Sequence, residues 1–403
     1  MIAKLSRWVG AVVAGALLAV LLATTSGAVR AQTGTTVDYT FGKQVSFARS
    51  LTTATPVRAA ELVIRALPNG PSVVLPAAVT TSAGSGQELR ATHDLTAHPL
   101  PPFAEIEFYW VLTPETGSAV ELGPETFVYD DNRFTWRTAA RGAARVHWYA
   151  GDLEFGQAAA DVAAAALQSI AQQLQADTPA RLEVYVYASA SDLQLGLQLG
   201  GRDWVAGHAD PELGVVLATI SPGAEQLLTM RRVIPHEIAH ILIYRITGSG
   251  YTNVPGWLNE GIAVASENDR NPVYLQVLTA AAESDAILPF QQLCGSFPVS
   301  GDDAVLAYAQ SGSLVDFISS QYGTAAIQTL LAAYADGATC KSGVQRALPT
   351  DLPGLQAAWE RTQLNRSALA SILRFALPAA LIFLLSALSL AVLSLPLRSR
   401  ASD

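Results

Sequence analysis

The sequence predicts an α+β protein, in which an all-β sandwich domain is followed by a domain of helices and strands and by a C-terminal transmembrane helix. Residues 35–148 consist of short runs rich in β-branched and aromatic residues, separated by turn residues, which is typical of a β-sandwich. From Gly156 onward, apolar residues recur at helical spacing instead. Near the end of the chain, the run from Phe375 to Leu397 contains no charged residue. Such a run predicts a helix that spans a bilayer.

The composition limits the classes of partner. Hydrophobic residues make up 50% of the 403 residues, charged residues make up 15%, and the formal net charge is −9. A chain of this length can bury a sizeable core in about two or three domains. The acidic balance, with no basic stripe, argues against a nucleic-acid partner.

The N-terminus has the pattern of a targeting segment. Lys4 and Arg7 precede the apolar run from Trp8 to Ala23, and Val29-Arg-Ala31 offers small residues for cleavage. Residues 1–31 are therefore predicted to be a signal peptide. An uncleaved membrane anchor is the alternative.

At the other end, residues 372–397 are predicted to cross the lipid bilayer as a single helix. The basic tail at residues 398–403 is expected in the cytoplasm, because positive residues favour that side. With a signal peptide upstream, these segments predict a single-pass protein of the cell membrane whose middle part is extracellular.

The strands expected in the sandwich alternate apolar and polar residues, so their charged side chains are expected to face solvent. They are Ala60–Arg65, Ser72–Leu75, Ile106–Leu112 and Ala144–Tyr149. No binding partner of this domain can be read from the sequence.

The second domain is expected to mix helices and strands, with helices dominating its C-terminal part. The expected helices are Gln157–Ala176, Ser191–Leu199, Val305–Ser319, Ala325–Tyr334 and Leu352–Leu364. The expected strands are Arg181–Tyr187, Trp204–Gly207 and Val215–Ile220.

Within this domain, His236-Glu237-x-x-His240 is the main candidate for a chemical site. On a helix, the two histidines lie one turn apart on one face and can bind one metal ion, while Glu237 points toward a water molecule on it. Zinc makes such a water more acidic, and a carboxylate can take its proton. The motif therefore predicts hydrolytic chemistry. Pro235 directly before it predicts a kink or a restart of the helix.

A catalytic zinc ion needs a third protein ligand, and the segment Trp257-Leu-Asn-Glu260-Gly supplies Glu260. The interval after His240 leaves room for a loop at Gly248–Gly250 and for a second helix that returns beside the first. We therefore expect His236, His240 and Glu260 to be the metal ligands.

HExxH followed at this interval by Trp-Leu-Asn-Glu-Gly-x-Ala resembles the gluzincin zinc metallopeptidases, and most of all the peptidase MA-like family, which is related to thermolysin and to the aminopeptidase N family. The resemblance covers residues 150–365 and implies a zincin-like (thermolysin-like) metallopeptidase domain, placed at 149–366, that acts on peptides or proteins. It implies Zn²⁺ held by His236, His240 and Glu260, with Glu237 as general base. The chain lacks the Gly-Ala-Met-Glu-Asn strand with which the aminopeptidase N family holds an amino terminus.

The resemblance also implies a group that stabilises the oxyanion. Tyr308 resembles the tyrosine that follows the zinc motif in gluzincins, although Gln310-Ser311 replaces the usual Lys-Gly; packing in the helical lobe is the alternative. Tyr251 is the next candidate. Similar enzymes place an edge strand along the cleft, and His208 lies beside the strand expected to do so.

Two competing functions remain from the sequence. One is a non-catalytic surface-binding protein with a vestigial or structural zinc site, although an intact Glu237 is not needed there. The other is an intramembrane protease, but Arg231, Arg232 and Arg245 bracket a segment too short to span a bilayer. Cys294 and Cys340 form a disulfide or stay as free thiols, and the sequence leaves both open.

Overall fold

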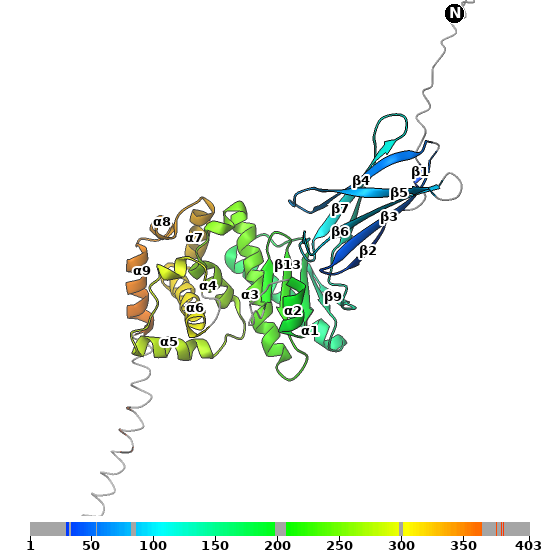
Figure 1. The fold of residues 1–403 in the computed structure, drawn as a ribbon. Coiled ribbons are helices and arrows are strands. Elements are labelled where there is room, and N and C mark those ends of the chain that lie inside the picture. Colours follow the sequence, from blue (N-terminus) through cyan, green and yellow to red (C-terminus); the bar gives the residue numbers. More distant parts are fainter. Residues whose placement is uncertain are drawn as a thin grey trace, which may run out of the picture.

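The computed structural model describes residues 30–31, 34–53, 55–81, 86–197, 207–297 and 301–364, together with Ala376, Ala380 and Ile382. An antiparallel N-terminal sheet is followed by a second, smaller sheet and then by a helical region (Figure 1).

Within the described residues, the N-terminal sheet has eight strands in the order β1-β3-β6-β5-β4-β7-β8, with β2 beside β3. Residues 73–77 of β5 pair with β4, whereas residues 78–81 pair with β6. The sheet therefore folds over at β5, and its two halves face each other: the rings of Phe47 and Phe108 lie 5.1 Å apart. The strands are β1 (Arg30–Ala31), β2 (Thr36–Thr40), β3 (Gln44–Thr52), β4 (Val57–Ala66), β5 (Val73–Thr81), β6 (Gly86–Asp94), β7 (Glu105–Pro114) and β8 (Val120–Val128).

Alternation along the strands explains this core. In β7, Ile106, Phe108, Trp110 and Leu112 are buried, while the residues between them are partly exposed, as expected for a strand with one face on a core. The predicted all-β segment is thus confirmed as a β-sheet structure, but as a half-barrel made from one sheet rather than as two separate sheets. The alternation is the same in both arrangements.

The second sheet, as far as the structure describes the chain, has five strands in the order β12-β13-β11-β10-β9. Strands β10, β11 and β13 are parallel, and β12 is an antiparallel edge strand. β9 and β10, which lie inside the segment predicted as the sandwich, pair with this sheet instead. The strands are β9 (Arg137–Arg141), β10 (Ala144–Trp148), β11 (Leu182–Tyr187), β12 (Gly207–Asp210) and β13 (Val215–Thr219).

Helices α1 and α3 cover one face of this sheet, α2 packs on the opposite face, and the other helices pack beyond α3 (Figure 1). The long helix predicted after Gly156 is confirmed as α1, which Asp152 caps by accepting from the amide of Phe155. The helices predicted in the C-terminal part correspond to α6, α7 and α9. The helices are α1 (Leu153–Leu174), α2 (Ala190–Leu197), α3 (Gln226–Thr247), α4 (Gly256–Ser266), α5 (Val273–Glu283), α6 (Asp302–Tyr322), α7 (Ala325–Ala335), α8 (Cys340–Ala347) and α9 (Leu352–Trp359), with the short 3₁₀ helices η1 (Gly248–Asn253) and η2 (Gln292–Cys294) and the short π-helix η3 (Glu360–Leu364).

Two features bear on the predictions for this region. α3 continues as one helix through Pro235, so the helix does not restart there. Cys294 of η2 and Cys340 of α8 form a disulfide across a sequence separation of 46 residues. This bond ties the segment after α5 to the C-terminal helices.

Aromatic side chains join the half-barrel to the second sheet. Phe103, in the loop before β7, lies with its ring 4.0 Å from that of Tyr185 in β11. On the half-barrel side, the rings of Phe103 and Phe41 are 6.5 Å apart. Asp131 adds a polar contact, because it accepts from the hydroxyl of Tyr187 at 2.9 Å and pairs with Arg133 at 2.6 Å.

The predicted location at the cell membrane is wrong by the structural evidence. Among the helices of the described ranges, none is long and apolar enough to cross a bilayer. The single-pass location and the bilayer as partner rested on such a helix, and the extracellular middle part rested on that helix together with the signal peptide. The predicted signal peptide at 1–31, span at 372–397 and tail at 398–403 lie almost wholly outside the described residues.

Candidate functional site

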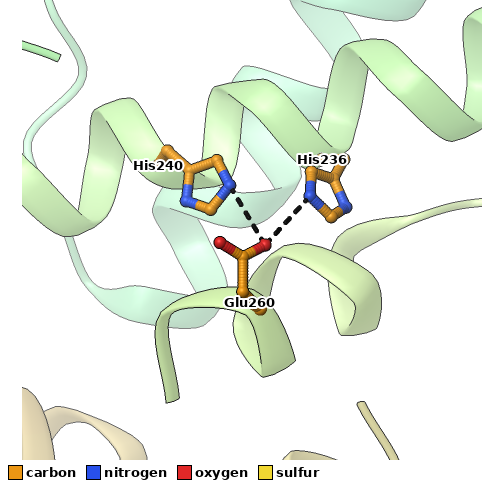
Figure 2. Close-up of side chains that lie close together, drawn as sticks. All are labelled: His236, His240 and Glu260. Atoms are coloured by element: carbon orange, nitrogen blue, oxygen red, sulfur yellow. Dashed lines mark ion pairs between the residues drawn. The ribbon is translucent and has the colours of Figure 1, made fainter. Parts of the chain in front are cut away.

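Three side chains from two helices meet beside the second sheet. His236 and His240 come from α3, and Glu260 comes from α4 (Figure 2). Oε2 of Glu260 lies 3.4 Å from Nε2 of His236 and 3.7 Å from Nε2 of His240. One ligand atom from each residue lies within 4.8 Å of the other two. Two imidazole nitrogens and one carboxylate oxygen are a donor set that suits zinc with an open fourth position.

The packing of α4 brings these groups together. α4 lies against both α3 and α6. A β carbon on Gly261 would lie 2.5 Å from the carbonyl oxygen of Ser311 in α6, so only glycine permits this approach. The close packing carries Glu260 and the α6 residue Tyr308 to the same place.

Hydrogen bonds orient both histidine rings. Nδ1 of His236 lies 3.0 Å from Oε1 of Glu267, and Nδ1 of His240 lies 3.1 Å from Oδ1 of Asn259. Both acceptors require the proton on Nδ1, so Nε2 of each ring, which lies on the side of Glu260, is the atom that would bind a metal ion. Asn259 donates in turn to the hydroxyl of Tyr251 at 3.2 Å.

The charges around the site favour a cation. Burial acts to lower the pKa of His236, but hydrogen bonds to Glu260 and Glu267 outweigh it and raise the pKa to about 10. Burial likewise acts to raise the pKa of Glu260, but His240 and His236 lower it below its ordinary value. The donor set is thus held in surroundings that stabilise positive charge.

Glu237 lies beside the three donors and against the edge strand. A β carbon on Gly207 of β12 would lie 2.4 Å from Oε1 of Glu237, so the carboxylate packs on the strand backbone. Burial raises the pKa of Glu237. A raised pKa makes a carboxylate a stronger base toward a water molecule.

A cavity of about 240 Å³ contains all five predicted site residues: Glu237, Tyr308, His236, His240 and Glu260. Its wall also includes Gly207, His208, Ala209, Pro211, Tyr251 and Asn259. The ring centroids of Tyr308 and His236 are 6.2 Å apart. The two candidate tyrosines and His208 therefore face the same space.

Sequence reasoning missed three residues of this site. Asn259 directly precedes Glu260, and its place in the Asn-Glu-Gly segment was a signal that could have found it. Glu267 follows α4 as a carboxylate with no motif spacing of its own. Gly207 ended a strand that was expected along the cleft, but its contact with Glu237 depends on where β12 lies.

The chain belongs to the Peptidase MA superfamily, whose family model matches residues 162–365. The resemblance predicted from the motifs is thereby confirmed. None of the curated proteins matches the chain.

Several solved structures are similar to the chain. A mutant of an M1 zinc metallopeptidase from Deinococcus radiodurans is 14% identical, with 79% of this chain and 90% of that chain covered and a TM-score of 0.36. An aminopeptidase N family protein from Idiomarina loihiensis is 9% identical, with 75% of this chain and 70% of that chain covered and a TM-score of 0.34. A bromine derivative of BhCBM56 is 15% identical, with 25% of this chain and 97% of that chain covered and a TM-score of 0.17.

Proposed function

We propose that this protein is a zinc-dependent metallopeptidase that hydrolyses peptide bonds in peptide or protein substrates. One observation carries the proposal: the nitrogen and oxygen donors of His236, His240 and Glu260 lie within 4.8 Å of one another, in one cavity with Glu237. Membership of the Peptidase MA superfamily supports it. Zn²⁺, when bound, supplies Lewis acidity to water and to the substrate carbonyl.

The chain's own residues have distinct roles in this proposal. Glu237 takes a proton from the attacking water and passes it to the nitrogen of the leaving amine, as its raised pKa allows. Tyr308 donates a hydrogen bond to the oxygen that becomes negatively charged in the transition state. Asn259 and Glu267 hold the two imidazole rings in the tautomer that binds the metal.

The proposal includes two domains. The sequence placed the β domain at 35–148 and the zincin-like gluzincin domain at 149–366. β9 pairs with β10, and β10 pairs with β11, which favours a boundary just before β9. The active site would then lie wholly in the second domain.

The alternative is a non-catalytic binding protein with a structural zinc site. Structural zinc sites are typically closed by four protein ligands. Among the described residues, the cluster supplies three, and it borders a cavity that also contains Glu237. These features favour the peptidase.

The test combines metal analysis with a cleavage assay on the whole chain. Purified protein is analysed for zinc by mass spectrometry and incubated with a peptide library whose products are sequenced. The matched control is Glu237→Gln, which keeps the volume and the three donors but removes the base. We expect zinc in both proteins and cleavage only in the wild type. Zinc without any cleavage by the wild type would support the binding protein, and an absence of zinc would contradict both.

A further inference from the structure

Pro235 leaves one carbonyl group of α3 without its usual donor. In an α-helix, the amide of residue 235 would donate to the carbonyl oxygen of residue 231, but proline has no N–H. The structure supplies another donor: the amide nitrogen of Asn268 lies 3.0 Å from the carbonyl oxygen of Arg231. A main-chain hydrogen bond from outside the helix thus replaces one within it.

The same segment carries a group that contacts the metal site. Glu267 directly precedes Asn268, and its Oε1 lies 3.0 Å from Nδ1 of His236, the residue that directly follows Pro235. The Glu267 side chain is almost fully buried, with 2% exposed. Its other oxygen has no hydrogen-bond partner within the described part of the chain. The orientation of this carboxylate therefore depends on how its backbone is held against α3.

The backbone geometry shows how this contact arises. Glu267 ends α4 with φ −63° and ψ 123°, so the chain leaves the helix in an extended conformation there. Asp269, the next residue, makes two further contacts with α3. Its carbonyl oxygen accepts from Nε of Arg232 at 3.1 Å, and its carboxylate lies 3.7 Å from the guanidinium of Arg231. The ion pair is largely exposed, and such pairs stabilise little. The main-chain bond to Arg231 is the contact that proline makes available.

We propose that Pro235 is a positioning residue for the metal site: by leaving the Arg231 carbonyl free for Asn268, it holds Glu267 against His236. This inference rests on the proposed function, because it concerns the affinity of that same site for zinc. An alanine at 235 would bring back an N–H that competes for the Arg231 carbonyl. Glu267 would then hold the His236 ring less firmly, and partners of this kind tune metal affinity about 10- to 100-fold.

If Pro235 had only a local effect on the helix, its replacement would be stabilising and not harmful. Proline inside a helix disfavours the helix, so Pro235→Ala should stabilise α3 if its only effect is local. The experiment measures the zinc dissociation constant by competition with a chromophoric chelator, and the melting temperature of the zinc-free protein. We expect Pro235→Ala to weaken zinc binding about 10-fold while the zinc-free melting temperature is unchanged or higher. Zinc binding as tight as in the wild type would overturn the proposal.

A double-mutant cycle tests whether the effect passes through Glu267. In a Glu267→Ala background, Pro235→Ala should change zinc affinity less than about twofold, because the group it positions is gone. An undiminished loss in that background would also overturn the proposal.

Asn268→Pro removes the same hydrogen bond from the other side and leaves α3 intact, so it serves if Pro235→Ala does not fold. The ψ of Glu267 is one that a following proline accepts. This variant should weaken zinc binding to the same degree, and unchanged affinity would count against the idea. A wild type that binds no zinc contradicts the proposed function itself, whereas zinc binding unaffected by these variants contradicts only the role of Pro235.

Discussion

The carboxylate of Glu237 in α3 packs directly against Gly207 of β12. No side chain fits between them, since even a methyl group on Gly207 would overlap the Glu237 carboxylate at 2.4 Å. The edge strand therefore fixes the position of the proposed general base.

Gly207→Ala is expected to lower kcat about 10²-fold, because displacement of a reacting group by about 1 Å has effects of that size. Zinc content should not change, as the three donors are not touched. The matched control is Gly295→Ala, where an added β carbon meets nothing within 4 Å. Steady-state kinetics and metal analysis check both variants. Wild-type turnover in Gly207→Ala would show that Glu237 has room to shift without loss of function.

Removal of any single donor should release zinc. His236→Ala, His240→Ala and Glu260→Ala each leave two protein ligands where a catalytic zinc site uses three. Zinc retained after dialysis against a chelator is the measurement. His208→Ala is the control, since His208 lines the cavity outside the donor set. A Glu260 variant that retained zinc as the wild type does would identify another third ligand.

Substitutions of Tyr308 and Tyr251 should affect different quantities, turnover in the first case and zinc affinity in the second. Tyr308→Phe is expected to lower kcat about 10²-fold with little change in KM or zinc content, the pattern for a contact made mainly in the transition state. Tyr251→Phe should weaken zinc binding instead, because the Tyr251 hydroxyl accepts from Asn259, which orients His240. Kinetics and zinc titration of both variants separate the roles. Equal turnover in the wild type and in Tyr308→Phe would transfer the oxyanion role away from Tyr308.

The disulfide should contribute to stability and not to metal binding. Replacing both cysteines with serine opens a cross-link over a sequence separation of 46 residues, which corresponds to on the order of 4 kcal/mol of unfolding free energy. Chemical denaturation with and without reducing agent measures this difference. Reducing agent should destabilise only the wild type. Zinc content lost in the serine variant would show that the disulfide also supports the site.

The sequence was sufficient to bring His236 and His240 together, because their spacing requires only that their segment be helical, whereas their role as metal ligands stays a prediction. It was not sufficient for Glu267. The contact of Glu267 with His236 depends on the segment after α4, which the Asn268 amide holds against α3 by a hydrogen bond to the Arg231 carbonyl. It also could not distinguish a sandwich from a half-barrel. That difference lies in β5, which pairs with β4 along one half and with β6 along the other, and no side-chain pattern records it.

The aromatic contact between Phe103 and Tyr185 affects how the protein unfolds. Buried Tyr185, Tyr187, Val215 and Leu217 form one apolar cluster with Phe103 and with Leu193 of α2, so the half-barrel covers the part of this face that α2 leaves open. A fragment that begins at β9 would expose this face and tend to self-associate. Heating should accordingly melt the half-barrel and the second sheet together in one transition, as a single cooperative unit.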